Sequence, residues 1–236
     1  MALLRLDKII SSTGEYSRRQ VKDLIKAGKV TVNGSFPPGP ESKYDPGSAI
    51  IVIDGIQLNY RTNTYIMLNK PQGVITATKD GKLRTVMDLL PDKYSRIDLF
   101  PVGRLDIDTE GLLLITDDGL LAHNLLSPGK HVDKKYYAEV DGMLTQDDCT
   151  AFSKGITLAD GTEFLPGVLE TVSENSAYVI IHEGKFHQVK RMLGYLGKPV
   201  TYLKRLQMGP LVLDPALKTG EYRELTSEEV NLLKNC

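Results

Sequence analysis

The chain lacks the features that several large protein classes require. Its two cysteines, Cys149 and Cys236, form no Cys-x-x-Cys motif, so we expect free thiols in a reducing compartment. The four histidines are scattered and predict no metal site. No apolar run approaches the ~18 residues of a membrane span, and we expect no signal peptide. A Walker loop and a Gly-x-Gly-x-x-Gly turn are also missing, which argues against a nucleotide cofactor. These absences predict a cytoplasmic protein without a metal or cofactor.

Charge is distributed unevenly along the chain, although the formal net charge is only -1. Residues 1–30 carry seven Lys or Arg residues against three acids, and residues 185–205 carry six against none. Two basic segments in a chain of nearly neutral total charge indicate a polyanionic partner that is held at two places. The alternative is that both segments are simply solvated surfaces.

Residues 1–60 predict a small α/β module that binds its partner electrostatically. A helix is expected over Leu6–Ser12, and a second helix begins at the capping box of Ser17 and Gln20 and ends near Gly28. The polar face of this second helix carries four cations: Arg18, Arg19, Lys22 and Lys26. Strands and turns are expected at 29–32 with Asn33-Gly34, and at 50–53 and 56–58 with Asp54-Gly55, separated by a loop over 35–48. The polar stretch Asn59–Thr64 predicts a linker.

Residues 61–236 predict a second, larger domain of the α+β class. Strands are expected over 65–68, 112–116, 136–140 and 177–181. Helices are expected over 86–90, 120–126, 146–154, 187–196 and 226–233, with Thr145 capping the third and a Thr226/Glu229 capping box opening the last. Because strands and helices do not alternate strictly, we expect a mixed, mostly antiparallel sheet flanked by helices.

The segment from Gly103 to Gly119 contains the strongest candidate for chemistry. The apolar run from Leu112 to Ile115 predicts a buried strand, and Asp106 lies just before it, two residues from Arg104. A carboxylate fixed beside a buried strand and held ionised by a nearby cation meets the requirements for a nucleophile or a charge stabiliser. The alternative is a capped loop that carries solvated acids.

Two further segments add an aromatic residue and a group of cations. Lys134 and Tyr136 stand at the start of an expected strand. The segment Glu183–Met192 places His187, Gln188, Lys190 and Arg191 at the start of an expected helix. Cations at a helix N-terminus oppose the helix dipole, which indicates a phosphate or carboxylate partner. An ordinary half-exposed strand and a solvated basic helix remain the alternatives.

Together these segments resemble the RsuA-type ribosomal pseudouridine synthases. The family signature is similar to Gly-Arg-Leu-Asp-x-x-Thr-x-Gly-Leu-Leu, here Gly103–Leu113. The later signatures match Lys134-x-Tyr136 and Gly184–Met192, and the opening Asn69-Lys70-Pro71-x-Gly73-Val74 is similar too. Residues 3–60 resemble the small S-four-type RNA-binding domain that often precedes this catalytic domain.

The resemblance implies a role for each candidate residue. Asp106 would be the nucleophile or charge stabiliser, Tyr136 would stack on the target uracil, and Lys190 would pair with Asp106. RNA contacts are expected from residues around this site and from the N-terminal module, namely Arg104, His187, Gln188 and Arg191 together with Arg18, Arg19, Lys22 and Lys26. No metal or cofactor is implied.

The implied function is isomerisation of a specific uridine in small-subunit (16S) rRNA or its assembly intermediate, by a cytoplasmic monomer that does not associate with membranes. The Leu-Asp-Ile-Asp-Thr core at 105–109 and the tail at 213–223 are more similar to the small-subunit enzymes than to their large-subunit relatives. Two alternatives remain: the same reaction on large-subunit rRNA, and a catalytically silent RNA-binding factor of ribosome assembly. An unrelated Asp-dependent transferase or hydrolase would need a second carboxylate, a base or a metal nearby.

Overall fold

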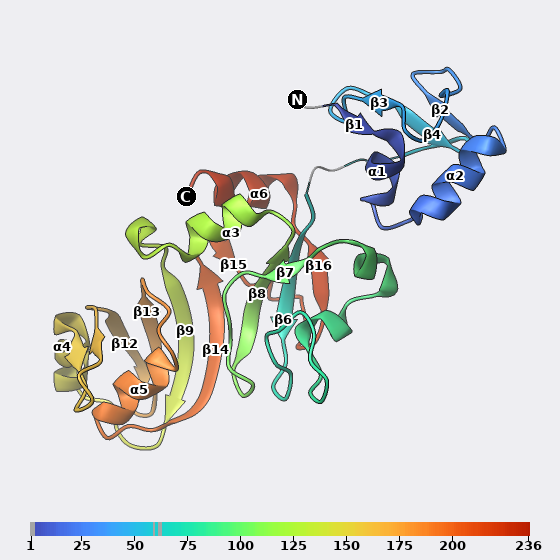
Figure 1. The fold of residues 1–236 in the computed structure, drawn as a ribbon. Helices are drawn as coiled ribbons and strands as arrows, with labels where there is room; N and C mark the ends of the chain where they lie inside the picture. The colour runs from blue at the N-terminus through green and yellow to red at the C-terminus, as the bar shows by residue number, and fades with distance from the viewer. Residues whose placement is uncertain (1–2, 59, 61–62) are drawn as a thin grey trace. The chain divides into compact units, whose positions relative to one another are not determined.

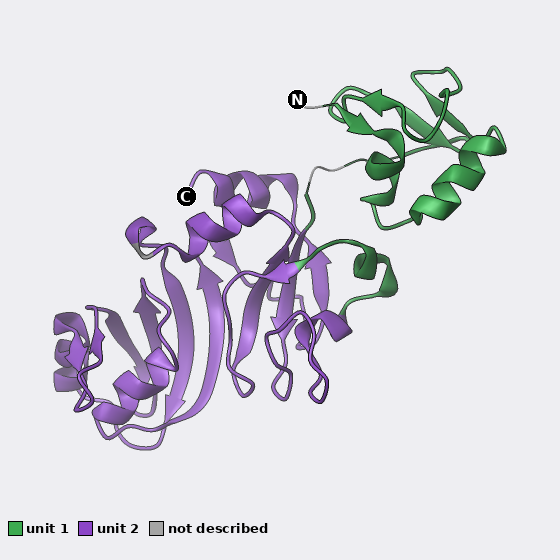
Figure 2. Cartoon of the chain, viewed as in Figure 1, with its two compact units in different colours: residues 1–64, 90–99 green, residues 65–89, 100–236 purple. Residues whose placement is uncertain are grey.

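The computed structural model describes residues 3–58, 60 and 63–236, which form two compact units (Figures 1 and 2). Unit 1 comprises residues 1–64 and 90–99, and unit 2 comprises residues 65–89 and 100–236. The domain boundary after residue 60 stays a prediction. The expected linker includes Asn59, Arg61 and Thr62, which lie outside the described residues.

Unit 1 consists of short helices and strands around a small apolar core. Its elements are β1 (Leu4–Arg5), α1 (Leu6–Ser11), α2 (Arg18–Lys26), β2 (Val30–Val32), β3 (Lys43–Tyr44), β4 (Ile51–Ile53), β5 (Ile56–Gln57) and the 3-10 helix η2 (Asp92–Arg96). The core side chains come from both helices and from β2 and β4: Leu6, Ile9, Ile10, Val21, Val30, Val32, Ile51 and Ile53. The expected helices, the capping box of Ser17 and Gln20, and the hairpin of β4 with β5 are confirmed.

Two details of unit 1 differ from the expectation. Asn33 and Gly34 form a two-residue turn with positive φ angles of 51° and 79°, as expected for a hairpin. However, β2 pairs mainly with β4 rather than with the residues that directly follow the turn. The expected loop over 35–48 contains β3, which pairs with β1. A two-residue strand carries too short a pattern to be recognised from sequence.

Unit 2 is built on one large sheet. The strands of unit 2 are β6 (Tyr65–Lys70), β7 (Phe100–Pro101), β8 (Glu110–Thr116), β9 (Lys134–Val140), β10 (Ile156–Thr157), β11 (Glu163–Phe164), β12 (Val168–Ser173), β13 (Ser176–Ile181), β14 (Val200–Met208), β15 (Leu211–Val212) and β16 (Tyr222–Glu224). Of these, β10 and β11 pair with each other outside the large sheet. Its helices are α3 (Gly119–Leu126), α4 (Gln146–Lys154), α5 (Gln188–Tyr195) and α6 (Ser227–Lys234), with 3-10 turns η1 (Val86–Leu89) and η3 (Pro128–Lys130).

The strand order in this sheet is β12-β13-β9-β14-β8-β6-β16, with β15 beside β14 and β7 beside β8. Among the described strand pairs of this sheet, β14 and β8 are parallel and the others are antiparallel. The mixed, mostly antiparallel sheet flanked by helices is therefore confirmed, and the fold class is α+β.

Burial explains why the strands differ in sequence pattern. Every residue of β6 is buried, and so is every residue of β8 after Glu110, because both faces of these strands are covered. Both strands are therefore apolar along most of their length, with polar residues only at their ends. In β9, buried and half-buried residues alternate, so Tyr136 shares the covered face with Lys134, Ala138 and Val140. This alternation turns Tyr136 toward the side of the sheet over which α5 lies (Figure 1).

The helices of unit 2 begin largely where their caps predict. Thr145 and Thr226 accept hydrogen bonds from the N3 backbone of α4 and α6, and Asp118 does the same for α3. α3 and α6 pack on a common core with β6 and β8 (Figure 1). The helix expected over 86–90 is the 3-10 turn η1, because a segment of four residues ahead of Pro91 is too short for an α-helix.

Several strands of unit 2 were not expected, and β12 and β14 are the longest of them. β14 is the most consequential because it occupies the middle of the sheet. Its sequence has no clean alternation, since its pairing with β9 shifts register between Val200 and Tyr202 and again between Arg205 and Gln207. Within the described part of the chain, no helix has both the length and the apolar character needed to cross a membrane.

Candidate active site

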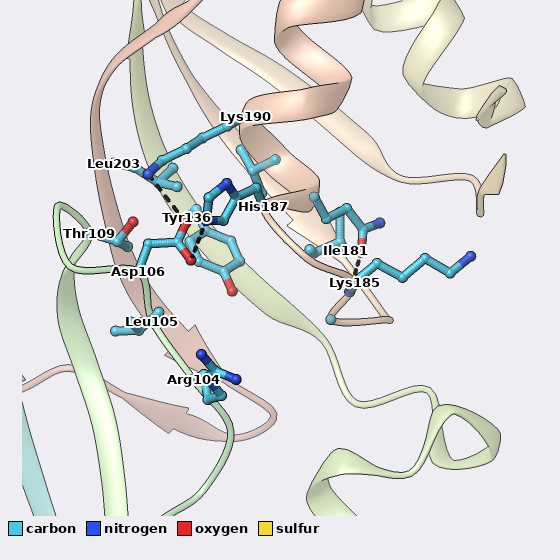
Figure 3. A pocket seen from close by; sticks show the side chains of 13 residues that line it. Arg104, Leu105, Asp106, Thr109, Tyr136, Ile181, Lys185, His187, Lys190 and Leu203 are labelled. Atoms are coloured by element: carbon cyan, nitrogen blue, oxygen red, sulfur yellow. Dashed lines mark hydrogen bonds and ion pairs between the residues drawn. The ribbon is translucent and has the colours of Figure 1, made fainter. Parts of the chain in front are cut away.

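A pocket lies between the loop that precedes β8, the middle of the sheet and the start of α5 (Figure 3). The loop contributes Arg104, Leu105, Asp106 and Thr109, the sheet contributes Tyr136, Ile181 and Leu203, and the turn into α5 contributes Gly184, Lys185, His187, Gln188, Val189 and Lys190. The three segments that the sequence analysis singled out therefore meet at one place, although they are about 30 to 80 residues apart in the chain.

Backbone hydrogen bonds hold the loop of Asp106 in a defined shape. The Thr109 N–H donates to the Asp106 carbonyl at 3.1 Å, which closes a turn, and the Gly73 N–H donates to the Ile107 carbonyl at 2.8 Å. The Thr76 hydroxyl accepts from the Leu105 N–H at 3.1 Å and donates to its carbonyl at 2.7 Å. A loop tied to its neighbour on both sides of Asp106 presents the carboxylate in a fixed direction.

Lys70 anchors the same loop from beneath. It is fully buried at the end of β6, and its ammonium donates to the carbonyls of Pro71 (3.0 Å), Asp106 (3.0 Å) and Thr109 (2.9 Å). Burial lowers the pKa of Lys70 to about 8, against the opposing attraction of Asp106 and other nearby acids. All three N–H bonds of the ammonium are thus used to hold backbone around the pocket.

The Asp106 carboxylate has a cationic partner at one oxygen and an imidazole at the other. Lys190 Nζ lies 3.2 Å from Oδ2, and His187 Nε2 lies 3.4 Å from Oδ1 (Figure 3). Lys190 also contacts Asp108 Oδ1 at 2.5 Å, and this hydrogen bond lowers the pKa of the Asp108 carboxyl. Lys190 therefore bridges two carboxylates, of which Asp106 is the less exposed at 28% against 64%.

Tyr136 forms the wall of the pocket beside Asp106. It is buried, and in the sheet it is paired with Val179 on one side and Arg205 on the other. Figure 3 shows its ring next to the Asp106 carboxylate, and Tyr136 is one of the residues that line the pocket. A planar aromatic surface that is fixed by neighbouring strands can receive a flat ring by stacking.

The predicted RNA-binding residues of the α5 segment have different surroundings. Gln188 is buried, and its amide donates to Glu183 Oε1 at 2.8 Å and accepts from the Lys185 N–H at 3.1 Å, so it shapes the turn before α5. Arg191 donates to Asp160 Oδ2 at 2.6 Å and to the Thr162 hydroxyl at 3.1 Å, which ties α5 to the loop between β10 and β11. Both side chains thus have partners inside the protein.

Arg104 does not hold Asp106, contrary to the expectation of a guanidinium within reach. It is exposed, and within residues 3–58, 60 and 63–236 no ion pair joins it to Asp106. Lys190 and His187 occupy that position instead. In unit 1 the cations of α2 lie on its exposed surface: Arg18, Arg19, Lys22 and Lys26. A role in RNA binding stays a prediction for all of them.

Sequence reasoning gave no role to Lys70, Thr76 or Thr109. The signal for Lys70 was the Asn-Lys-Pro opening, where a lysine ends an otherwise apolar strand. Thr109 belongs to the first signature; it is buried at the pocket, and no described residue is a hydrogen-bond partner of its hydroxyl. Thr76 forms hydrogen bonds with the backbone of Leu105, which is distant in sequence, so no local sequence pattern indicates its role. The described residues contain no group of three or more His, Cys, Asp or Glu side chains that could hold a metal ion.

Known proteins similar to this chain cover nearly all of it. The "Uncharacterized RNA pseudouridine synthase YtzG" of Bacillus subtilis (strain 168) is 44% identical over 234 residues, 98% of each chain. The "Ribosomal small subunit pseudouridine synthase A" of Vibrio cholerae is 40% identical over 228 residues, 96% of this chain and 98% of that one. A crystal structure of a pseudouridylate synthase matches with a TM-score of 0.69 at 33% identity, over 98% of this chain and 99% of that one.

Family models agree with both halves of the fold. The S4 domain model matches residues 4–35, in the unit that carries the basic helix α2. The model described as RNA pseudouridylate synthase matches residues 64–195, which include Asp106, Tyr136 and Lys190. A match over more than half of the chain, joined by relatives that align from end to end, establishes that this chain belongs to the RNA pseudouridylate synthase family and carries an S4 domain at its N-terminus.

Proposed function

We propose that this protein converts a specific uridine of small-subunit (16S) rRNA, or of its assembly intermediate, to pseudouridine, with Asp106 as the nucleophile or charge stabiliser. The observation that carries the proposal is the Asp106 carboxylate held in a pocket beside Tyr136 by Lys190 and His187. We also propose that the protein acts as a cytoplasmic monomer, without a metal or cofactor.

The reaction needs little from outside the substrate. It breaks the bond between N1 and C1′ of one uridine and joins C5 to C1′ of the same nucleotide. C5 of uracil is already nucleophilic, and no redox change takes place. The C5 proton is released after the new bond forms and N1 takes up a proton, so the product is an isomer and only protons are exchanged. The enzyme has to extrude the base, exclude water and present one ionised carboxylate.

Asp106 suits that task because of its surroundings. Its backbone carbonyl is held by Lys70 and its carboxylate by Lys190, so both its position and its negative charge are supported. A fixed carboxylate next to the ribose would either attack it or stabilise positive charge that develops at C1′. Lys190 would pair with the Asp106 carboxylate, and its contact with Asp108 would keep the Lys190 ammonium in place.

Tyr136 would stack on the target uracil and assist removal of the proton from C5. Its ring is rigidly placed by β13 and β14, and it lies at the pocket beside Asp106. Exposed cations would then contact the RNA backbone: Arg104 near the pocket and the α2 face of the S4 domain. Single-stranded or loop RNA favours this arrangement, because an unstacked base is available there for stacking on an aromatic ring.

The small-subunit target is supported by the names of several relatives. Proteins called ribosomal small subunit pseudouridine synthase A in Vibrio cholerae, Pseudomonas aeruginosa and Escherichia coli are 36–40% identical to this chain over nearly its whole length. The intact Asp106, Tyr136 and Lys190 favour an enzyme over a silent assembly factor on the same scaffold. Reaction on large-subunit rRNA remains the competing target.

The direct test is tritium release from rRNA labelled at C5 of uridine, with chelator-treated protein and no added nucleotide. We expect release from small-subunit rRNA or one of its assembly intermediates, at a single site when the product is mapped. Release only from large-subunit RNA would overturn the target. No release from any rRNA would overturn the enzymatic function.

Asp106→Asn tests the role of the carboxylate, because it keeps the size of the side chain and removes its charge. Turnover should disappear, while RNA affinity and the melting temperature stay close to those of the wild type. Asp117→Asn, in the turn after β8 and outside the pocket, is the control and should remain active. Residual turnover of Asp106→Asn within tenfold of the wild type, about 1.4 kcal/mol of transition-state stabilisation, would exclude a nucleophilic role.

A further inference from the structure

We infer that His187 is a positioning residue of the reaction centre, which holds Oδ1 of Asp106 while Lys190 holds Oδ2. This inference rests on the proposed function and deepens it. His187 was expected only to touch RNA, yet its Nε2 lies 3.4 Å from the carboxylate on which the chemistry depends. The contact is longer than an optimal hydrogen bond, and such contacts commonly tighten when substrate enters the site.

The backbone of His187 is the first sign that its side chain is placed for a purpose. The residue is the N-cap of α5 with φ 49° and ψ 32°, the left-handed conformation that non-glycine residues rarely adopt. At an N-cap a side chain normally accepts a hydrogen bond from the helix, but the His187 side chain makes no such bond. The strained conformation therefore does not serve the helix. It directs the imidazole toward Asp106 instead.

A buried hydrogen-bond network holds the turn that imposes this conformation. Gln188 accepts from the Lys185 N–H and donates to Glu183, and Glu183 in turn accepts from the Leu165 N–H at 2.8 Å. Gln188 and Glu183 are both more than nine-tenths buried. Because the network fixes the residues on either side of His187, the direction of its ring is set by the protein core.

The ring is also supported on one face. Phe186 stacks on it with centroids 3.7 Å apart and an angle of 19° between the planes. The stacked pair leaves the edge that carries Nε2 free to meet Asp106, and His187 keeps 40% of its side chain exposed. An imidazole that is stacked on one face and anchored through its backbone has few alternative positions.

Two contacts from one element hold a carboxylate better than a single contact does. A carboxylate with one ion pair can still rotate about its side-chain bonds, whereas contacts at both oxygens fix its plane. His187 is the N-cap of α5 and Lys190 lies in its first turn, and the two side chains contact different oxygens of the same carboxylate. The contact does not depend on the charge of the ring, since Nε2 can donate a hydrogen in the neutral as well as in the protonated imidazole.

The test compares His187→Asn with His187→Gln in single-turnover tritium release at saturating small-subunit rRNA. The Gln amide nitrogen can take the place of Nε2, whereas the Asn side chain is one methylene too short to reach Oδ1. Asn tolerates the left-handed conformation better than Gln does. We therefore expect His187→Asn to fold well and to lose at least tenfold in rate, and His187→Gln to stay within about threefold of the wild type. RNA affinity should change by less than threefold in both.

His131→Asn is the matched control, because His131 has the same φ of 49° and lines no part of the pocket. It should react at the wild-type rate. A wild-type rate for His187→Asn, or equal losses for Asn and Gln, would overturn the inference. Weaker RNA binding with an unchanged saturating rate would make His187 an RNA contact only. If the wild type itself released no tritium from any rRNA, the proposed function would fall, and this inference with it.

Discussion

At the scale of single residues, the pocket is organised by two lysines whose ammonium groups bind several oxygen atoms each. Lys70 holds three carbonyl oxygens and Lys190 holds two carboxylates. The buried Lys70 is costly, because desolvation disfavours its charged form, and its three hydrogen bonds to backbone carbonyls partly offset that cost.

Lys70 leads to a prediction in which stability and activity change in opposite directions with pH. Its pKa is about 8 in the folded protein and about 10.5 in the unfolded chain. Between these values the unfolded chain binds more protons, so the free energy of unfolding rises with pH, by about 3 kcal/mol over the window. In the same window the neutral amine can donate to only two of its three carbonyls, and turnover should fall.

The measurement is urea denaturation and single-turnover rate from pH 7 to 10, for the wild type and for Lys70→Met. Other titrating groups cancel in the difference between the two proteins. As pH rises through this interval, the wild type should gain stability and lose rate relative to Lys70→Met. A stability difference that is independent of pH would show that Lys70 does not deprotonate in the folded protein.

The sequence patterns predicted which residues meet in the pocket better than which contacts those residues make. Asp106, Tyr136 and Lys190 were predicted, and the structure brings all three to one pocket. Arg104 was expected beside Asp106, but the position belongs to Lys190 and His187. A motif names the residue types that chemistry requires, whereas the partner of each side chain depends on how distant segments fold together.

At the scale of secondary-structure elements, β14 connects the two halves of the large sheet. It pairs in parallel with β8 and antiparallel with β9. Where β8 and β14 run in parallel, Gly111 of β8 is paired with Arg205 of β14, and the φ angle of Gly111 is 102°. A Cβ atom on Gly111 would lie 2.2 Å from the Arg205 carbonyl oxygen and 2.8 Å from its nitrogen. The close parallel pairing therefore requires glycine at this position.

Gly111→Ala should force β8 away from β14 and destabilise unit 2. We expect the free energy of unfolding in urea to fall by about 3 kcal/mol or more, from backbone strain together with overpacking. Gly119→Ala is the control: the added methyl meets no heavy atom within 4 Å and lies at the start of α3. Its stability should stay within about 1 kcal/mol of the wild type. Similar stabilities for the two variants would contradict the close approach at Gly111.

Elements with a local signal were predictable, and those that depend on tertiary pairing were not. The capping threonines predicted α4 and α6, and the apolar run at 112–115 predicted β8. β14 was missed because it contains Lys204 and Arg205 and its bulges interrupt the alternation. Arg205 is buried and donates to the Leu112 carbonyl at 2.8 Å, a partner 93 residues away that the sequence does not reveal.

At the scale of the whole molecule, positive charge is divided between the pocket and the S4 domain. The α2 cations are exposed and belong to unit 1, whereas the described residues that line the pocket belong to unit 2. They can therefore supply affinity for RNA phosphates without taking part in the reaction.

Replacing all four α2 cations by glutamine (Arg18, Arg19, Lys22 and Lys26) should weaken RNA binding and leave the saturating rate nearly unchanged, provided that chemistry limits turnover. The slope of log affinity against log salt should fall by roughly 0.7 for each lost contact with single-stranded RNA, and by about 0.9 for duplex RNA. Binding measured across salt concentrations checks this, with Lys154→Gln of α4 as a control of unchanged slope. Equal slopes and affinities for the quadruple variant and the wild type would show that this face does not touch RNA.

The place of β14 in the sheet also determines when during synthesis the protein can become active. Asp106, Tyr136 and Lys190 all precede β14 in the chain. Among the described strands, β8 and β9 do not pair with each other, and both pair with β14. A growing chain that ends before residue 200 thus carries all three proposed catalytic residues and yet has no strand to bring Asp106 beside Tyr136. We expect catalysis to begin only after β14 has been synthesised and has inserted between β8 and β9. The gain of activity during refolding should therefore report the pairing of β14 with these two strands.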